Sequence, residues 1–111
     1  MLRVDTTQLL KGVLDLAVLA VLRQDDGYGY DLLRRLRETG LEEVGDASVY
    51  GTLRRLFKVG ALKSYVVPSD EGPHRKYYGI NGVGIDQLAA GRKTWQSFVS
   101  AMDVVLDQES T

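Results

Sequence analysis

The chain has 111 residues, 44% of them hydrophobic and 26% charged, which is the balance of a folded globular protein with its own core. It contains no Cys and a single His, so a disulfide scaffold, a thiolate zinc site and a cysteine nucleophile are excluded. The formal net charge of -1 shows that the chain is not basic overall, although a local basic surface is compatible with that total.

The first predicted helix covers residues 7–23, with Thr6 or Thr7 as its cap. Apolar residues lie on nearly every side of this helix, so more than one neighbour has to cover it, which hints at a second subunit. Its longest apolar stretch, 16–22, is too short to cross a membrane, and the polar start of the chain is unlike a signal peptide. We therefore expect a cytoplasmic, single-domain protein.

Two further helices are predicted after turn residues 24–27. The second covers residues 28–39 and ends at Gly40; its leucines form a buried stripe, and three arginines are expected to face outward: Arg34, Arg35 and Arg37. The third covers residues 47–59, with Asp46 or Gly45 as its cap. Its predicted buried face is formed by Val49, Leu53, Leu56 and Phe57.

The hydrophobic periodicity then changes from helical to alternating. Segments 62–67 and 75–80 are rich in β-branched and aromatic residues and predict a β-hairpin, with the Pro- and Gly-containing stretch 68–73 as its loop. Tyr77 and Tyr78 point to opposite faces of the second strand, so one of them should belong to the core. Asn81 is the expected cap of a last helix that reaches Val105 or beyond.

The last predicted helix carries a heptad pattern. Its a and d positions are Ile85, Leu88, Arg92, Trp95, Val99, Met102 and Leu106. Because such a seam needs a partner helix, we expect a homodimer whose interface uses the six apolar members of this seam and part of the first helix. The alternative is that the seam packs on the first helix of its own chain.

Three helices followed by a two-stranded hairpin predict a winged helix-turn-helix. The expected fold class is mainly α with a β-hairpin, divided into a DNA-binding domain over 1–80 and a C-terminal dimerisation helix over 81–111. Residues 47–67 contain no acid and the following basic residues: Arg54, Arg55, Lys58 and Lys63. A basic third helix suits binding to the major groove of duplex DNA. The alternative is that these arginines are a solvated helix face.

Four segments follow one another along the chain: LLKGVLDLAVLAVL, GYGYDLLRRLRE, SVYGTLRRLFKVGAL and GPHRKYYGINGVG. In this order and spacing they resemble the PadR family of bacterial transcriptional regulators, and the one short helix after the wing is similar to the smaller subclass of that family. The chain departs from the family's frequent Thr-Leu-Tyr-Pro at residues 48–51, and from its Leu-Thr at Ile80-Asn81. The resemblance implies a dimeric DNA-binding regulator, expected to be a repressor. No cofactor and no enzymatic activity are expected, because the chain has no Cys, a single His and no Gly-rich phosphate loop before a helix.

The resemblance also implies which residues contact DNA, with helix 47–59 in the major groove and wing 62–80 on the backbone or minor groove. The candidates are Ser48, Tyr50, Thr52, Arg54 and Arg55 on the third helix, Arg75 and Lys76 on the wing, Tyr28 before the second helix, and Lys11 on the first. Hydroxyl and phenol groups can bind phosphates or base edges, and an arginine can bind guanine with two hydrogen bonds. The sequence leaves open whether Arg54 or Arg55 reads bases, and which of Tyr28 and Tyr30 packs inside.

Trp95 lies near the middle of the last helix, where a two-fold axis would bring two copies together. In some short PadR relatives, a Trp at this position lines a pore that holds flat aromatic compounds. The resemblance thus implies a small aromatic effector bound by Trp95 with Arg92 and Val99. The alternative is that Trp95 only packs in an interface.

A second reading of the whole chain is a winged-helix protein-interaction module without specific DNA binding, because a fold alone does not give a function. Such modules commonly present an acidic or apolar face at the third helix. The basic third helix of this chain is the feature that favours DNA binding over this alternative.

Overall fold

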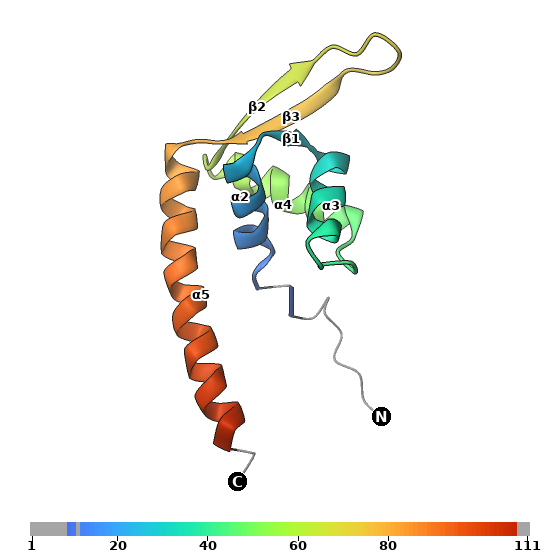
Figure 1. The fold of residues 1–111 in the computed structure, drawn as a ribbon. Coiled ribbons are helices and arrows are strands. Elements are labelled where there is room, and N and C mark those ends of the chain that lie inside the picture. The colour runs from blue at the N-terminus through green and yellow to red at the C-terminus, as the bar shows by residue number, and fades with distance from the viewer. Residues whose placement is uncertain (1–8, 11, 109–111) are drawn as a thin grey trace.

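The structure is a computed structural model that describes residues 9, 10 and 12–108 (Figure 1). Its elements follow in the order α2 (Leu14–Gln24), β1 (Gly27–Tyr28), α3 (Gly29–Glu38), α4 (Asp46–Lys58), β2 (Leu62–Val67), β3 (Arg75–Ile80) and α5 (Gly82–Gln108). The predicted fold class is confirmed: the chain is mainly helical, with a small antiparallel sheet and a long C-terminal helix.

The first helix is shorter than predicted. Residues 9 and 10 are helical, residues 12–13 form a turn, and α2 begins only at Leu14. The interruption falls at Gly12, and glycine weakens a helix because it loses more backbone freedom there than other residues do. The Val13 N–H donates to the carbonyl of Leu10 at 3.0 Å, which closes the turn. The expected cap at Thr6 or Thr7 lies outside the described residues.

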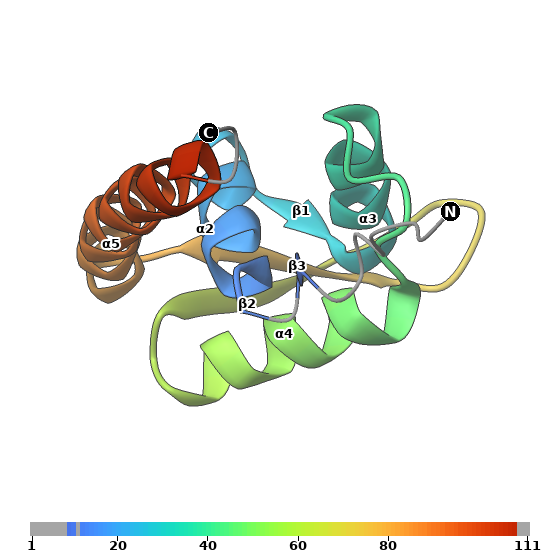
Figure 2. The same cartoon turned by 90° about the horizontal axis from the view of Figure 1, so that it is seen from below.

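The core lies around α2, which contacts α3, α4, α5 and β3. Figure 2 shows α2 between α5 and α3, with α4 crossing beneath them in that view. The largest fully buried side chains come from these helices and the connection between α3 and α4: Val18, Leu19, Leu22, Leu32, Leu36, Val44, Val49, Leu53 and Leu56. The chain's own neighbours therefore cover much of the apolar surface of α2, and that surface alone does not require a second subunit.

The sheet has three strands in the order β1-β3-β2. The predicted hairpin is confirmed with the predicted strand bounds, and its register runs from Leu62 opposite Ile80 to Val67 opposite Arg75. The connection 68–74 extends away from the helices as the tip of the wing (Figure 1). The short strand β1 was not predicted; Gly27 was expected in a turn and Tyr28 at the start of the second helix, but they pair with Tyr78 and Tyr77 of β3.

Helix α5 begins with the predicted cap. The Asn81 side-chain oxygen accepts a hydrogen bond from the Gly84 N–H at 3.0 Å, and its amide nitrogen donates to the Gly60 carbonyl at 2.8 Å. A Cβ on Gly84 would lie 2.3 Å from the carbonyl oxygen of Ala61, so this glycine allows α5 to start against the end of α4. None of the described helices combines the length and the hydropathy needed to cross a membrane.

Candidate nucleic-acid interface

The outward face of α4 is polar and basic. Tyr50, Arg54 and Lys58 follow one another at intervals of four residues, so they project from the same side of the helix, and all three are exposed. Ser48, in the first turn, is exposed as well. Tyr50, Arg54 and Lys58 thus form one surface that carries two positive charges and one hydroxyl group, whereas Ser48 lies on the flank of α4 that it shares with Arg55.

Thr52 does not belong to this face. It is only 4% exposed and is buried with Val49, Leu53 and Leu56 on the side of α4 that packs inward. The expectation that Thr52 contacts DNA is therefore wrong. The sequence spacing already predicts this burial. Thr52 follows Val49 by three residues and precedes Leu56 by four, which places all three on one side of a helix.

The two arginines of α4 have different surroundings. The Arg55 guanidinium donates to the carboxylate of Asp15 on α2, and both side chains remain partly exposed. Arg54 has no hydrogen bond or ion pair with any residue that the structure describes. A guanidinium without an intramolecular partner keeps all its donors available for a ligand. The structure thus distinguishes Arg54 from Arg55 by their hydrogen-bond partners, a difference that the sequence did not reveal.

The Tyr50 ring is held against the start of α3. A Cβ on Gly29 would lie 2.0 Å from Cε1 of Tyr50, a separation that no real side chain tolerates. The glycine between Tyr28 and Tyr30 therefore forms the seat of the Tyr50 ring. Sequence reasoning noted the tyrosines and missed this glycine, whose partner lies 21 residues further along the chain and gives no local signal.

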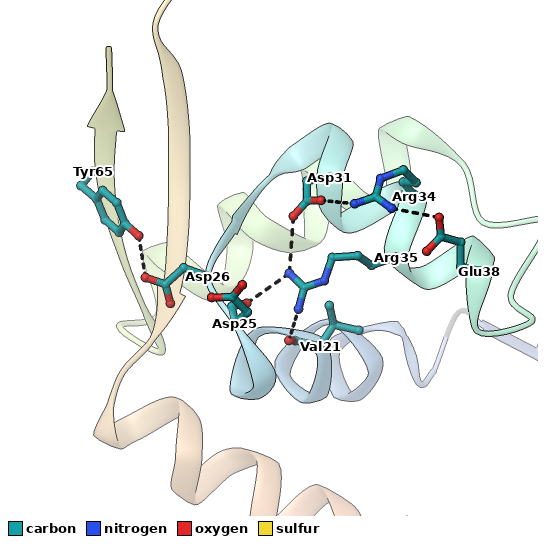
Figure 3. A network of polar contacts seen from close by, with 8 residues as sticks. All are labelled: Val21, Asp25, Asp26, Asp31, Arg34, Arg35, Glu38 and Tyr65. Atoms are coloured by element: carbon teal, nitrogen blue, oxygen red, sulfur yellow. Dashed lines mark hydrogen bonds and ion pairs between the residues drawn. The ribbon is translucent and has the colours of Figure 1, made fainter. Parts of the chain in front are cut away.

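Two of the three arginines of α3 donate to backbone carbonyls, although all three were predicted to face outward. Arg35 is only 19% exposed and donates to the carbonyls of Val21 at 2.7 Å and Asp25 at 3.1 Å, so the prediction that it faces outward is wrong (Figure 3). Arg37 donates to the Val44 carbonyl at 2.9 Å, and it too fixes the backbone. Both arginines donate to backbone carbonyls of segments that flank α3 and hold those segments in place. These contacts within the chain account for the positive charges of α3 without a nucleic acid.

The remaining arginine of α3, Arg34, is exposed and pairs within its own helix. It binds Asp31 at 2.7 Å and Glu38 at 2.9 Å (Figure 3). Pairs three and four residues apart on an exposed helix face add only a few tenths of a kcal/mol each, about 0.2–0.5. Its positive charge is locally compensated, unlike that of Arg54.

The wing is attached to the body by a row of tyrosine rings. The Tyr77 ring lies 5.4 Å from that of Tyr28 and 5.7 Å from that of Tyr65, measured between centroids. The Tyr65 hydroxyl donates to Asp26 at 2.6 Å, and this hydrogen bond raises the pKa of Tyr65 to about 12 (Figure 3). Tyr78 points the other way and is 7% exposed in the core, as the alternation predicted. The row fixes the wing relative to the turn after α2.

The two predicted wing cations lie over aromatic rings while they remain exposed. The guanidinium carbon of Arg75 is 4.6 Å from the centroid of Tyr28, and Nζ of Lys76 is 5.5 Å from that of Phe57. Cation–π contacts of this kind hold a side chain in place without consuming its hydrogen-bond donors. Lys76 is therefore held beside α4 and Arg75 beside β1, on opposite faces of the wing, with donors still available.

Of the two tyrosines around Gly29, Tyr28 is the one that packs. It is half-buried between Tyr77 and Arg75, whereas Tyr30 is 62% exposed. Tyr30 is therefore the more exposed of the two, although Tyr28 was the candidate chosen from the sequence. Lys11, the candidate DNA contact on the first predicted helix, lies outside the described residues.

Trp95 lines an apolar groove between α2 and α5. The groove has a volume of about 780 Å³, and its walls include Leu16 and Leu19 on α2 and Trp95 and Phe98 on α5. The rings of Trp95 and Phe98 are 6.2 Å apart between centroids. Arg92 and Val99, the other two candidates, are not among the described residues that line this groove.

Leu88 is the one apolar member of the α5 heptad seam that is buried in its own chain; Ile85 before it is 38% exposed, and the seam after it forms an open end. Leu88 is 5% exposed because it packs in the core of its own chain, as the alternative reading of the seam expected. Beyond it, Trp95, Met102 and Leu106 are 42%, 37% and 50% exposed. Phe98 and Val105, which lie off the predicted seam, are exposed as well. The second half of α5 thus presents large apolar side chains without cover from the described part of its own chain.

Comparison with known proteins identifies the family. Residues 18–90 match the model of the Transcriptional regulator PadR-like family, a range that runs from within α2 through α3, α4 and the wing to the first part of α5. The chain belongs to this family. The match ends before Trp95, so it includes α3, α4 and the wing and leaves out the second half of α5.

Solved structures of PadR-like regulators agree with this assignment. A PadR-like transcriptional regulator from Bacillus cereus is 33% identical, with 89% of this chain and 96% of that one covered and a TM-score of 0.78. A PadR family regulator from Eggerthella lenta is 28% identical, with coverage of 91% and 88% and a TM-score of 0.82. An uncharacterised protein of Lysinibacillus sphaericus is 27% identical over 91% of this chain and 94% of its own length.

The PadR-like assignment decides the broad function. The chain is a DNA-binding transcriptional regulator and not an enzyme, as the sequence predicted. The basic face of α4 and the wing cations are the parts of this PadR-like regulator whose chemistry suits contact with DNA.

Proposed function

We propose that this PadR-like regulator binds operator DNA as a homodimer and acts as a repressor, with α4 in the major groove and the β2–β3 wing on the backbone or minor groove. The observation that carries the proposal is the outward face of α4, where Arg54 is exposed and has no partner among the described residues. The wing adds two more exposed cations, Lys76 over Phe57 of α4 and Arg75 over Tyr28 of β1.

The different surroundings of the α4 arginines support different roles. Arg54, with its donors available, is assigned to a base edge, where a bidentate contact to guanine discriminates between base pairs by about 1–3 kcal/mol. Arg55, already bound to Asp15, is assigned to the phosphate backbone together with Ser48. Arg75 and Lys76 are assigned to phosphates at the wing, with Lys11 and Tyr30 or Tyr28 as further backbone contacts.

The open end of α5 supports the homodimer. Its exposed apolar side chains would lose contact with water if two α5 helices packed across a two-fold axis. The proposed interface is formed by Ile85, Trp95, Val99, Met102 and Leu106, to which the structure adds Phe98 and Val105. Leu88 leaves this set because it is buried within its own chain. In this proposal residues 81–111 serve as the dimerisation unit of a chain whose residues 1–80 bind DNA.

The groove beside Trp95 supports a small, planar, largely apolar effector that lowers operator affinity. Its volume of about 780 Å³ lies in the range of sites for such molecules. A guest between α2 and α5 changes the position of the helix that sets the separation of the two DNA-reading heads. It can act on DNA binding only through its different affinities for dimers of different separation, a coupling of about 1–3 kcal/mol in typical cases.

A salt series on duplex DNA tests the DNA-binding part of the proposal. Fluorescence anisotropy would measure binding to a duplex from the chain's own upstream region and to a scrambled duplex of equal length. We expect tighter binding to the first, and an affinity that falls steeply with salt for both, because phosphate contacts release counterions. Equal and salt-independent affinities would favour the protein-interaction module instead.

A further inference from the structure

One of the cations of α4 is bound to an acid on another helix. Arg55, in the last turn of α4, donates to the carboxylate of Asp15 in the first turn of α2, and Figure 2 shows α4 crossing beneath α2. Among the residues that the structure describes, this is the one ion pair that joins these two helices. Arg54 and Lys58, the other cations of α4, have no such partner within the described ranges. The cations of α4 are therefore not equally available to DNA.

The ion pair between Arg55 and Asp15 is open to solvent and to other ions. The side chain of Arg55 is 55% exposed and that of Asp15 is 41% exposed. Ion pairs with this exposure are weak, because water and dissolved ions compete with both partners. Ser48 lines the same hollow beside α4 as Asp15 and Arg55. A phosphate at this flank of α4 therefore meets a hydroxyl group and a guanidinium group, and it has to share the guanidinium with Asp15 or displace Asp15 from it.

We propose that Asp15 restrains Arg55 in the free protein and thereby lowers the affinity of this regulator for all duplex DNA. The inference rests on the proposed assignment of Arg55 to the phosphate backbone. Phosphate contacts carry no sequence information, so the restraint weakens operator and other duplexes by the same factor. The contact assigned to Arg54 then sets the preference among duplexes, and Asp15 sets the overall strength of binding. Asp15 is a positioning residue that acts through Arg55 and is not itself a DNA contact.

Asp15→Asn tests the restraint, because it keeps the shape of the side chain and removes its charge. Fluorescence anisotropy over a salt series is expected to show operator and scrambled duplexes bound about two- to fivefold more tightly than by the wild type, the strength of one exposed ion pair. The slope of log affinity against log salt is expected to steepen by up to about 1, because Arg55 then releases a phosphate counterion without leaving a bare carboxylate that takes one up. A carboxylate with a structural role alone would weaken binding when it is replaced.

Arg55→Ala separates the restraint from simple repulsion between Asp15 and DNA. Repulsion acts whether or not Arg55 is present, whereas the restraint needs Arg55. In a double-mutant cycle, Asp15→Asn is therefore expected to change the affinity of the Arg55→Ala chain by less than about 1.5-fold. Glu43→Gln, which removes an exposed acid just before α4, is the matched control and is expected to act equally with and without Arg55. Circular dichroism of each variant checks that the helices are intact.

The possible outcomes separate this inference from the proposed function. An Asp15→Asn chain with intact helices that binds duplexes no more tightly than the wild type would overturn the restraint and leave the DNA-binding proposal in place. A gain of equal size in the Arg55→Ala chain would overturn the route through Arg55. If Arg55→Ala left binding unchanged even in the Asp15→Asn chain, the assignment of Arg55 to the backbone would fail, and this inference with it.

Discussion

The close approach of Gly29 to Tyr50 gives a specific prediction about how α4 is held against α3. In Gly29→Ala the new Cβ would meet three ring atoms of Tyr50 at 2.0, 2.7 and 2.7 Å, so the ring has to leave its seat or α4 has to move away from α3. Overpacking of this kind costs about 1–3 kcal/mol of the free energy of unfolding. The substitution removes a helical glycine as well, which returns less than about 1 kcal/mol. We expect a net loss of about 1–2 kcal/mol.

Gly51→Ala is the matched control for this prediction. Gly51 lies inside α4, and the nearest atom to its missing Cβ is Nη2 of Arg54 at 3.9 Å, an ordinary contact. The control should therefore gain about 0.5–1 kcal/mol from better helix propensity. Urea denaturation followed by circular dichroism measures both variants. The double variant Gly29→Ala/Tyr50→Ala should recover part of the stability that the single variant Gly29→Ala loses. If Gly29→Ala matched the wild type in both stability and duplex affinity, the claim that the packing of Tyr50 on Gly29 holds α4 against α3 would be contradicted.

Three further predictions concern the dimer, the wing and the tyrosine row. Met102→Glu should shift the chain from dimer to monomer at micromolar concentration in analytical ultracentrifugation, because an unpaired carboxylate would be buried in the interface; an unchanged dimer would show that α5 is not that interface. Arg75→Ala should weaken operator and scrambled duplexes alike and lower the slope of log affinity against log salt by about 1, whereas a loss confined to the operator would mean that Arg75 reads bases. Asp26→Asn should lower the pKa of Tyr65 from about 12 towards its usual 10, as followed by ultraviolet titration of the phenolate. The raised pKa favours the neutral phenol in the fold, so its contribution to stability is complete below pH 10 and is lost as the pH rises through about 12; an unchanged titration in Asp26→Asn would contradict this assignment.

Local patterns in the sequence were sufficient for most of the fold. The hairpin strands were predicted to the residue because their alternation ends at Pro68 on one side and begins again after the loop on the other. The cap at Asn81 was predictable because its hydrogen bond reaches only three residues along the chain. Strand β1 was not predictable, since two residues carry no periodicity and their pairing partner lies about 50 residues away at Tyr78.

The candidate site shows the same division between local and distant contacts. Thr52 was assigned to the wrong side of α4 although helical spacing placed it with Val49, because the family resemblance matched it to a DNA-contacting position. The roles of Arg35 and Arg55 depend on carbonyl and carboxylate partners contributed by α2, which no spacing within their own helices reveals. Helical periodicity predicts which face of a helix is exposed, but only the packed structure identifies which exposed arginine already has a partner.

The most direct test of the account is the ratio of operator affinity to scrambled-duplex affinity in Arg54→Ala, measured by competition anisotropy at a fixed salt concentration. Arg92→Ala, an exposed arginine on α5, is the control. We expect Arg54→Ala to lower this ratio by about 5- to 150-fold, the size of one lost bidentate contact, while Arg55→Ala weakens both duplexes and changes the ratio little. An Arg54→Ala chain that kept the wild-type ratio would contradict the claim that the outward face of α4 reads the operator.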